Sequence, residues 1–115
     1  MILKDIFYEG AHLFNACKYN DAHITWEGVW KNGSELERPE IKGFIQLTGA
    51  ILNTKAGKIS SGKYLFNKSL SNISASVLIP EWVEFKPLLG EIMACLEHLD
   101  EKPYELLPRI EIIFQ

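Results

Sequence analysis

The chain has 115 residues, a formal net charge of -3, 47% hydrophobic residues and 23% charged residues. This length corresponds to one ordinary domain, and the apolar fraction is enough to build a core without a disulfide or a structural metal. The composition argues against disorder, the short apolar runs argue against a membrane span, and the acidic balance disfavours a dedicated nucleic-acid binder. We therefore expect a single helical domain over residues 1–115.

The first two predicted helices follow from apolar residues at helical spacing. One helix is expected over about residues 3–18. The second is expected to be capped by Asn20 or Asp21 and to continue to Lys31. Its end is predicted at Asn32-Gly33, because glycine readily adopts the left-handed conformation that ends many helices, here at Gly33.

Two further helices are predicted in the middle of the chain. Pro39 suits the first turn of the third helix, and Gly57 closes that helix. Ser60 or Ser61 is expected to start the fourth helix. Small residues of the third helix are expected to let a neighbouring helix approach closely: Gly43, Gly49 and Ala50.

The last third of the chain is predicted to contain one more helix and two irregular segments. Residues 77–85 are apolar but include Pro80, so we expect an extended crossover there. A fifth helix begins at Pro87 and stops at Lys102-Pro103, and residues 104–115 are expected to pack as an extended arm. The predicted fold is all-α: an antiparallel array of two helical hairpins and a fifth helix, with a C-terminal arm.

The N-terminus and the cysteines favour a reducing compartment. The opening sequence MILKDIFYEG has charged residues inside its apolar pattern and resembles no secretory signal, so the expected location is the cytoplasm. Cys17 and Cys95 are far apart, and each lies in an apolar helical pattern. We predict that both are buried free thiols rather than a disulfide or metal ligands.

The most function-like feature is a His-x-x-x-Glu-x-x-Trp pattern at His23, Glu27 and Trp30. In a helix, residues four apart stand one turn above the other on the same face. A histidine and a carboxylate at this spacing can ligate one metal, can act as an oriented acid–base pair, or can simply hydrogen-bond each other in a half-buried position.

The metal hypothesis implies a divalent cation held by His23 and Glu27, and it needs a third ligand, because a catalytic zinc normally takes three from the protein. The candidates lie on the first and third predicted helices: His12, Glu9, Asp5, Gln46 and Asn53. The His-Glu-x-x-His pattern of zinc proteases is absent, as is the second Glu-x-x-His helix of a di-iron bundle.

The charges are distributed unevenly, which bears on the partner. Residues 41–80 contain five lysines and no Asp or Glu. The lysines face either the acidic segments of the same fold or an anion, such as a phosphate or an acidic protein partner. No aromatic stacking pattern accompanies them, which disfavours RNA.

The region from about Gly10 to Ile73 resembles a known family. GAHLFNACKYNDAHITWEGVWK is similar to the opening helical hairpin of the domain of unknown function 309, and GFIQLTGAILNTKAGKISSGKYLFNKSL is similar to its second hairpin. The resemblance implies an all-helical fold whose function is not established, with metal binding conjectured for His23 and Glu27. Ile24 stands where the family often has Glu, and Asn53 where it often has His, and both differences remove potential ligands.

Three hypotheses about function follow. In the first, His23, Glu27, Trp30 and Gln46 line a pocket for a small ligand or metal between facing helices. In the second, the chain is a non-enzymatic interaction module whose helical hairpins take an acidic partner. In the third, His23 and Glu27 tie the two hairpins together and Trp30 fills the core. The sequence assigns no reaction, and it is compatible with either a monomer or an oligomer.

Overall fold

The computed structural model describes residues 2–115, and it consists of five α-helices with short connections. The helices are α1 (Leu3–Asn15), α2 (Tyr19–Asn32), α3 (Arg38–Lys55), α4 (Ile59–Ser74) and α5 (Phe85–Glu101). Two short 3-10 turns, η1 (Ile79–Glu81) and η2 (Tyr104–Leu106), precede and follow α5. The described residues form no strand and only one isolated antiparallel bridge, between Val83 and Phe114. The predicted all-α class is confirmed.

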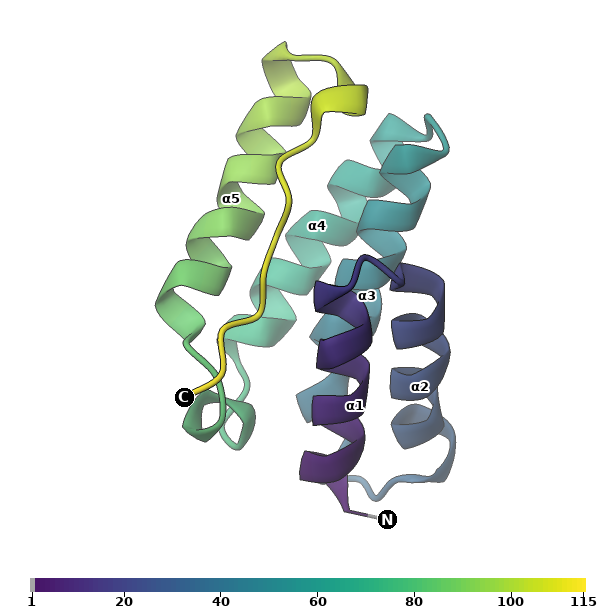
Figure 1. Cartoon of the computed structure of the whole chain (residues 1–115), viewed down its shortest axis with the longest axis vertical. Helices are drawn as coiled ribbons and strands as arrows, with labels where there is room; N and C mark the ends of the chain where they lie inside the picture. Colours follow the sequence, from purple (N-terminus) through teal and green to yellow (C-terminus); the bar gives the residue numbers. More distant parts are fainter. Residues whose placement is uncertain (1) are drawn as a thin grey trace.

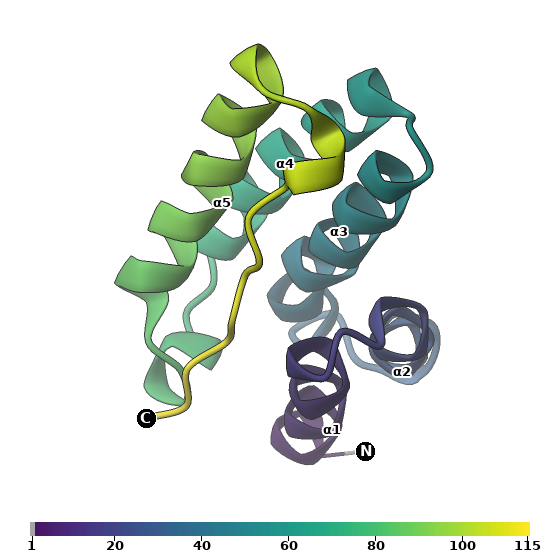
Figure 2. The ribbon, with the colours of Figure 1, turned by 45° about the horizontal axis from the view of Figure 1, so that its top comes forward.

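The helices pack as consecutive neighbours along the chain. Helices α1 and α2 form one antiparallel hairpin, α3 and α4 form a second, and α5 packs on α4 at the far end (Figures 1 and 2). Helix α3 also packs against α2, so it joins the two hairpins. Within residues 2–115, no helix is both long and apolar enough to cross a membrane.

The two hairpins turn in the same way. At the first turn Cys17 has a positive φ of 62°, and the Lys18 amide donates to the Leu13 carbonyl at 2.9 Å. At the second turn Gly57 has a φ of 81°, and a 2.9 Å bond again links the amide that follows it to a carbonyl near the helix end. Both turns therefore have the geometry of a Schellman motif. Cys17 occupies the position that usually requires glycine.

The end of α2 was predicted correctly, but three helix starts and one conformation were not. Helix α2 ends at Asn32, as predicted, whereas Gly33 has extended backbone, with φ -82° and ψ 171°, instead of the predicted left-handed conformation. Helix α2 begins at Tyr19 rather than after Asn20 or Asp21, and α4 begins at Ile59 rather than at Ser60 or Ser61. Neither helix has a side-chain cap, because the preceding turn already holds the first residues in place. Helix α5 begins at Phe85, before Pro87.

Close helix contacts depend on glycines, of which Gly10 and Gly43 are two. A methyl group added at Gly10 would lie 2.2 Å from Nε1 of Trp26, which donates to the Phe7 carbonyl at 3.2 Å. A methyl group added at Gly43 would lie 2.7 Å from the side chain of Ile73, so α3 and α4 approach closely there, as predicted. Trp26, rather than Trp30, is the tryptophan that fills the core: it is completely buried and stacks on Phe7.

Glu40 organises the connection between α4 and α5. Its side chain is 5% exposed, and its carboxylate accepts hydrogen bonds from the amides of Val77, Leu78 and Ile79 at 3.0, 2.9 and 3.2 Å. The connection thus forms a turn ending in η1 instead of the predicted extended crossover. A buried carboxylate with three backbone donors is a stable arrangement, because each donor satisfies part of its charge.

The C-terminal segment (residues 107–115) contains no helix and runs back along the molecule beside α5, so that Gln115 bonds to the connection between α4 and α5 (Figure 1). Ile110 and Ile112 are each 1% exposed and belong to the core. The segment lies between α5 and α1, because its backbone bonds with Glu91 on one side and with Asn15 on the other.

The cysteines differ from each other. Cys95 is buried, as predicted, whereas Cys17 is exposed, which corrects the prediction that it lies in the core. The correction follows from the turn: Cys17 comes two residues after the end of α1, where the helical face no longer continues.

Candidate functional site

The three motif residues lie along one side of α2, but they have different environments. His23 and Glu27 are half-buried against α3, with 26% and 39% of their side chains exposed. Trp30 is 44% exposed, one turn further along the helix. The expectation that Trp30 fills the core is therefore wrong, because Trp26 occupies the position that faces α1 and α3.

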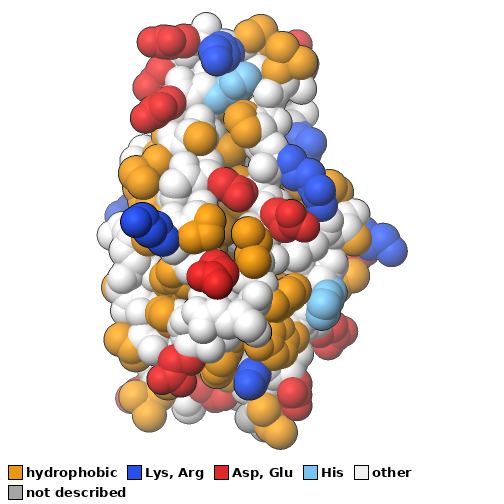
Figure 3. All heavy atoms as spheres, turned by 60° about the vertical axis from the view of Figure 1, so that its left-hand side comes forward, with side chains coloured by type: hydrophobic (Ala, Val, Ile, Leu, Met, Phe, Trp, Pro, Cys, Tyr) orange, Lys and Arg blue, Asp and Glu red, His pale blue; other side chains and the backbone are white. Residues whose placement is uncertain are grey.

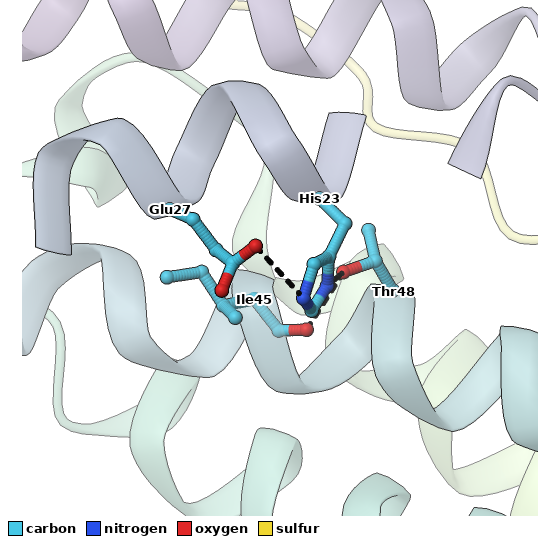
Figure 4. Close-up of polar contacts among 4 residues, drawn as sticks. All are labelled: His23, Glu27, Ile45 and Thr48. Atoms are coloured by element: carbon cyan, nitrogen blue, oxygen red, sulfur yellow. Dashed lines mark hydrogen bonds and ion pairs between the residues drawn. The ribbon is translucent and has the colours of Figure 1, made fainter. Parts of the chain in front are cut away.

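His23 is anchored to α3 by a buried hydroxyl. Its Nδ1 lies 2.7 Å from Oγ1 of Thr48, a residue that is completely buried (Figure 4). The same hydroxyl donates its proton to the Ile45 carbonyl at 2.7 Å. A hydroxyl has one proton to donate, so it must accept the hydrogen bond from His23, and Nδ1 must carry a proton. The geometry thus selects the tautomer of the imidazole ring.

This tautomer determines how His23 interacts with Glu27. In the neutral ring Nε2 has a lone pair, and it lies 3.5 Å from Oε1 of Glu27 (Figure 4). Two acceptors do not attract each other, so the contact becomes a hydrogen-bonded ion pair only when Nε2 also takes up a proton. Chemically, Nε2 beside this carboxylate is able to accept a proton or to bind a cation.

A metal site would need more ligands than the pair provides. Within residues 2–115, no group of three or more His, Cys, Asp or Glu side chains is placed to hold a metal ion. The ring of His12 instead lies 4.8 Å from that of Phe114, on the side of the C-terminal segment, and Glu9 and Asp5 are exposed on α1. Asn53 donates to the Gly49 carbonyl of its own helix.

Gln46 does not join His23 but supports a neighbouring hollow. Its Oε1 accepts a hydrogen bond from Nδ2 of Asn72, on α4, at 2.6 Å. Asn72 lines a surface hollow of about 360 Å³ together with Trp30, Arg38 and Lys42, and the rest of the lining comes from Glu35, Pro39 and Ala75. The predicted site residues thus divide into two places: His23 and Glu27 on the α2–α3 contact, and Trp30 with Gln46 at the hollow.

The hollow combines an aromatic surface with positive charge. Nζ of Lys42 lies 6.0 Å from the centroid of the Trp30 ring, and Nε of Arg38 donates to the Trp30 carbonyl at 2.9 Å. The hydrogen bond that Asn72 donates to Gln46 fixes the orientation of the Asn72 amide. Sequence reasoning missed Arg38, Lys42 and Asn72 as a group. Arg38 and Lys42 lie one turn apart on α3, but Asn72 comes from α4 and no motif links it to them.

Thr48 was also missed as the partner of His23. It lies on the buried face of α3, among apolar residues. A buried hydroxyl needs a hydrogen-bond partner. A threonine among the apolar residues of a helix face was therefore a signal that a polar side chain packs against it.

The geometry described above defines an all-α protein of paired helices, with a histidine tie between the pairs and a cationic, aromatic hollow beside it. The family comparison agrees with that class: the model of the Domain of unknown function (DUF309) matches residues 7–65. The chain belongs to this family. No curated protein and no solved structure matches it. The matched region contains His23, Glu27, Trp30 and Gln46.

Proposed function

We propose that the chain is a binding module whose site is the hollow at Trp30, and that its ligand is a small organic anion with a flat apolar body. The observation that carries the proposal is the exposed indole of Trp30 beside two cationic side chains, Arg38 and Lys42, in one hollow. A volume of about 360 Å³ lies in the usual range for sites that take small molecules.

The chemistry of the hollow favours an anion over a neutral ligand. Residues 41–80 contribute lysines and no carboxylate, so the only acid in the lining is Glu35, from the loop before α3. The indole face offers a surface on which a planar group stacks, and the charge of Lys42 attracts a carboxylate or phosphate attached to it. The Asn72 amide adds a polar group of fixed orientation.

In this proposal His23 and Glu27 position α2 instead of binding the ligand. The bond from His23 to the buried Thr48 holds α2 against α3, and the hollow lies between the ends of the same two helices and α4. Neither His23 nor Glu27 is among the residues that line this hollow. The tie therefore supports the site from outside, as a structural element.

Matched pairs of acids and amides test the proposal. We would titrate ¹⁵N-labelled protein with indole-3-acetate and indole-3-acetamide, and with 2-naphthoate and 2-naphthamide, and follow the indole N–H signal of Trp30. Each acid should shift this signal and bind about tenfold or more tightly than its amide, and Lys42→Met should remove most of that preference. Lys58→Met, which changes an exposed lysine outside the hollow, is the control.

Two results would contradict the proposal. The first is that acid and amide bind equally, which would show that the cations play no part. The second is that Lys42→Met and Lys58→Met weaken binding to the same extent, which would show general attraction to a positive surface. Elemental analysis of protein purified without chelators tests the metal hypothesis. We expect no metal in the wild-type chain that is lost in the His23→Ala variant.

A further inference from the structure

The C-terminal segment (residues 107–115) is bound in the way that proteins bind an extended peptide. Both backbone groups of Ile112 pair with one side chain: Nδ2 of Asn15 donates to its carbonyl at 2.8 Å, and its amide donates to Oδ1 of Asn15 at 2.8 Å. The amide of Glu84 donates to the Ile113 carbonyl at 2.8 Å. These bonds recognise backbone, so they hold an extended chain whatever its side chains are.

Side chains of the segment alternate between the protein and solvent. Ile110 and Ile112 are buried, and Phe114 lies against the α1 side chains Tyr8 and His12, with ring centroids 5.1 and 4.8 Å away. Ile113, between them, is 43% exposed. Alternating pockets combined with backbone bonds are the two components of recognition of an extended segment.

The surface that receives the segment, here called the groove, is formed by three separate elements. Asn15 comes from α1, Glu91 and Cys95 come from α5, and Val83 and Glu84 come from the connection before α5. Arrays of helical hairpins commonly bind extended segments along such surfaces. Figure 3 shows this side of the molecule, where acidic side chains lie among hydrophobic ones.

One position of the segment lies beside a carboxylate of the groove. The Glu91 carboxylate accepts a hydrogen bond from the Glu111 amide at 2.9 Å, so the residue that contacts this carboxylate carries a carboxylate of its own. Like charges at adjacent positions disfavour each other, whereas a basic residue in place of Glu111 would pair with Glu91.

We propose that the groove is a binding site for an extended segment of a partner protein, with the pattern aliphatic–basic–aliphatic–any–aromatic, and that residues 107–115 are its intramolecular competitor. The aliphatic and aromatic positions correspond to Ile110, Ile112 and Phe114, and the basic position corresponds to Glu111. Because the competitor is tethered, its effective concentration is high, and a partner must bind better than the chain's own segment to displace it. A basic residue in place of Glu111 adds an ion pair with Glu91 that the chain's own segment lacks.

A synthetic peptide added to the full chain tests the proposal. The probes are fluorescent peptides of residues 108–115 (PRIEIIFQ), one with the native sequence and one with Glu111→Lys, read by fluorescence anisotropy. The proteins are the full chain with Ile112→Asp, which weakens the attachment of its own segment, and with Ile113→Asp, which makes the same change at the exposed neighbour. All groove residues are unchanged in both proteins.

The Ile112→Asp chain should bind the Glu111→Lys peptide at least tenfold more tightly than the Ile113→Asp chain does. It should bind the native peptide more weakly than the Glu111→Lys peptide. Adding Asn15→Ala should remove most of the binding, since it deletes both hydrogen bonds to the backbone of residue 112. Equal binding by the two chains, no preference for lysine, or no effect of Asn15→Ala would each overturn the proposal.

Two further outcomes are decisive. If Ile112→Asp loses its helical circular dichroism signal, the peptide must restore that signal, and a failure to restore it would overturn the proposal. If the wild-type chain forms a dimer in light scattering that the Ile112→Asp chain does not form, the groove holds the segment of a second copy, and assignment to a different partner protein is wrong.

Discussion

The contact between His23 and Thr48 is the sharpest test of what the motif does. Thr48→Val removes the buried hydroxyl and keeps the shape of the side chain. The lost bond is 2.7 Å long and joins a fully buried oxygen to a half-buried ring. Such a bond contributes about 1 kcal/mol, because water satisfies the same groups in the unfolded chain. In a double-mutant cycle with His23→Ala, we expect a coupling energy of about 1 kcal/mol.

The coupling of His23 with Glu27 should be smaller. These groups are 3.5 Å apart and both partly exposed. With a neutral ring both atoms are hydrogen-bond acceptors, so we expect a coupling energy near zero. Urea denaturation at pH 7 followed by circular dichroism measures both cycles. A loss of 1 kcal/mol lowers the urea midpoint by roughly 0.5–1 M for a domain of this size.

The control is Thr48→Ser, which keeps the hydroxyl and should keep most of the coupling. Long-range ¹⁵N correlation spectra give a second measurement, since the neutral ring should carry its proton on Nδ1. A His23–Thr48 coupling energy near zero, or a proton found on Nε2, would refute the reasoning that His23 is a tie between the hairpins.

Three further predictions concern stability. Glu40→Gln should lower the free energy of unfolding by about 2 kcal/mol or more, because an amide has one acceptor oxygen for three backbone donors; thermal denaturation measures it. Cys17→Gly should raise stability by about 1 kcal/mol in urea, since the positive φ disfavours any residue with a Cβ. Burial raises the pKa of Cys95 to about 12 and also raises the pKa of Tyr19. As the pH rises above about 9, these two groups therefore lose their protons in the unfolded chain before they do so in the folded chain. The free energy of unfolding should fall from there towards pH 12, and it should fall less steeply in Cys95→Val.

The helices were predictable because each buries one face of a 3.6-residue period. The periodicity does not specify helix ends, and these were the main errors. At Cys17 the apolar pattern continues past the last residue of α1, but the backbone has already turned, so a cysteine predicted in the core is exposed.

The Tyr19 hydroxyl lies 3.5 Å from the Cys17 sulfur, and this hydrogen bond lowers the pKa of the thiol.

The site was predicted in part: the sequence indicated the residues that share one helix, but not those that packing between helices brings together. His23, Glu27 and Trp30 were found because they lie on one helix, where spacing determines which side chains are neighbours. Thr48 and Asn72 become their neighbours only through packing between helices, and no spacing within the chain encodes that. Trp26 and Trp30 are one turn apart, and which of them is buried depends on how α1 and α3 pack against α2.

The two proposed sites lie on different parts of the chain, and that separation makes them independently testable. The region matched by the family model, residues 7–65, contains the His23–Thr48 tie and five of the seven residues that line the hollow, among them Trp30, Arg38 and Lys42. It does not contain helix α5, which forms one wall of the groove, and it does not contain residues 107–115, which occupy the groove. Since no residue lines both sites, Lys42→Met should leave peptide binding in the Ile112→Asp chain unchanged, and Asn15→Ala should leave binding of the aromatic acids unchanged. Loss of both activities in either variant would mean that the two hairpins respond as one unit, and α3, which packs against α2 and α4, is the element through which they would do so.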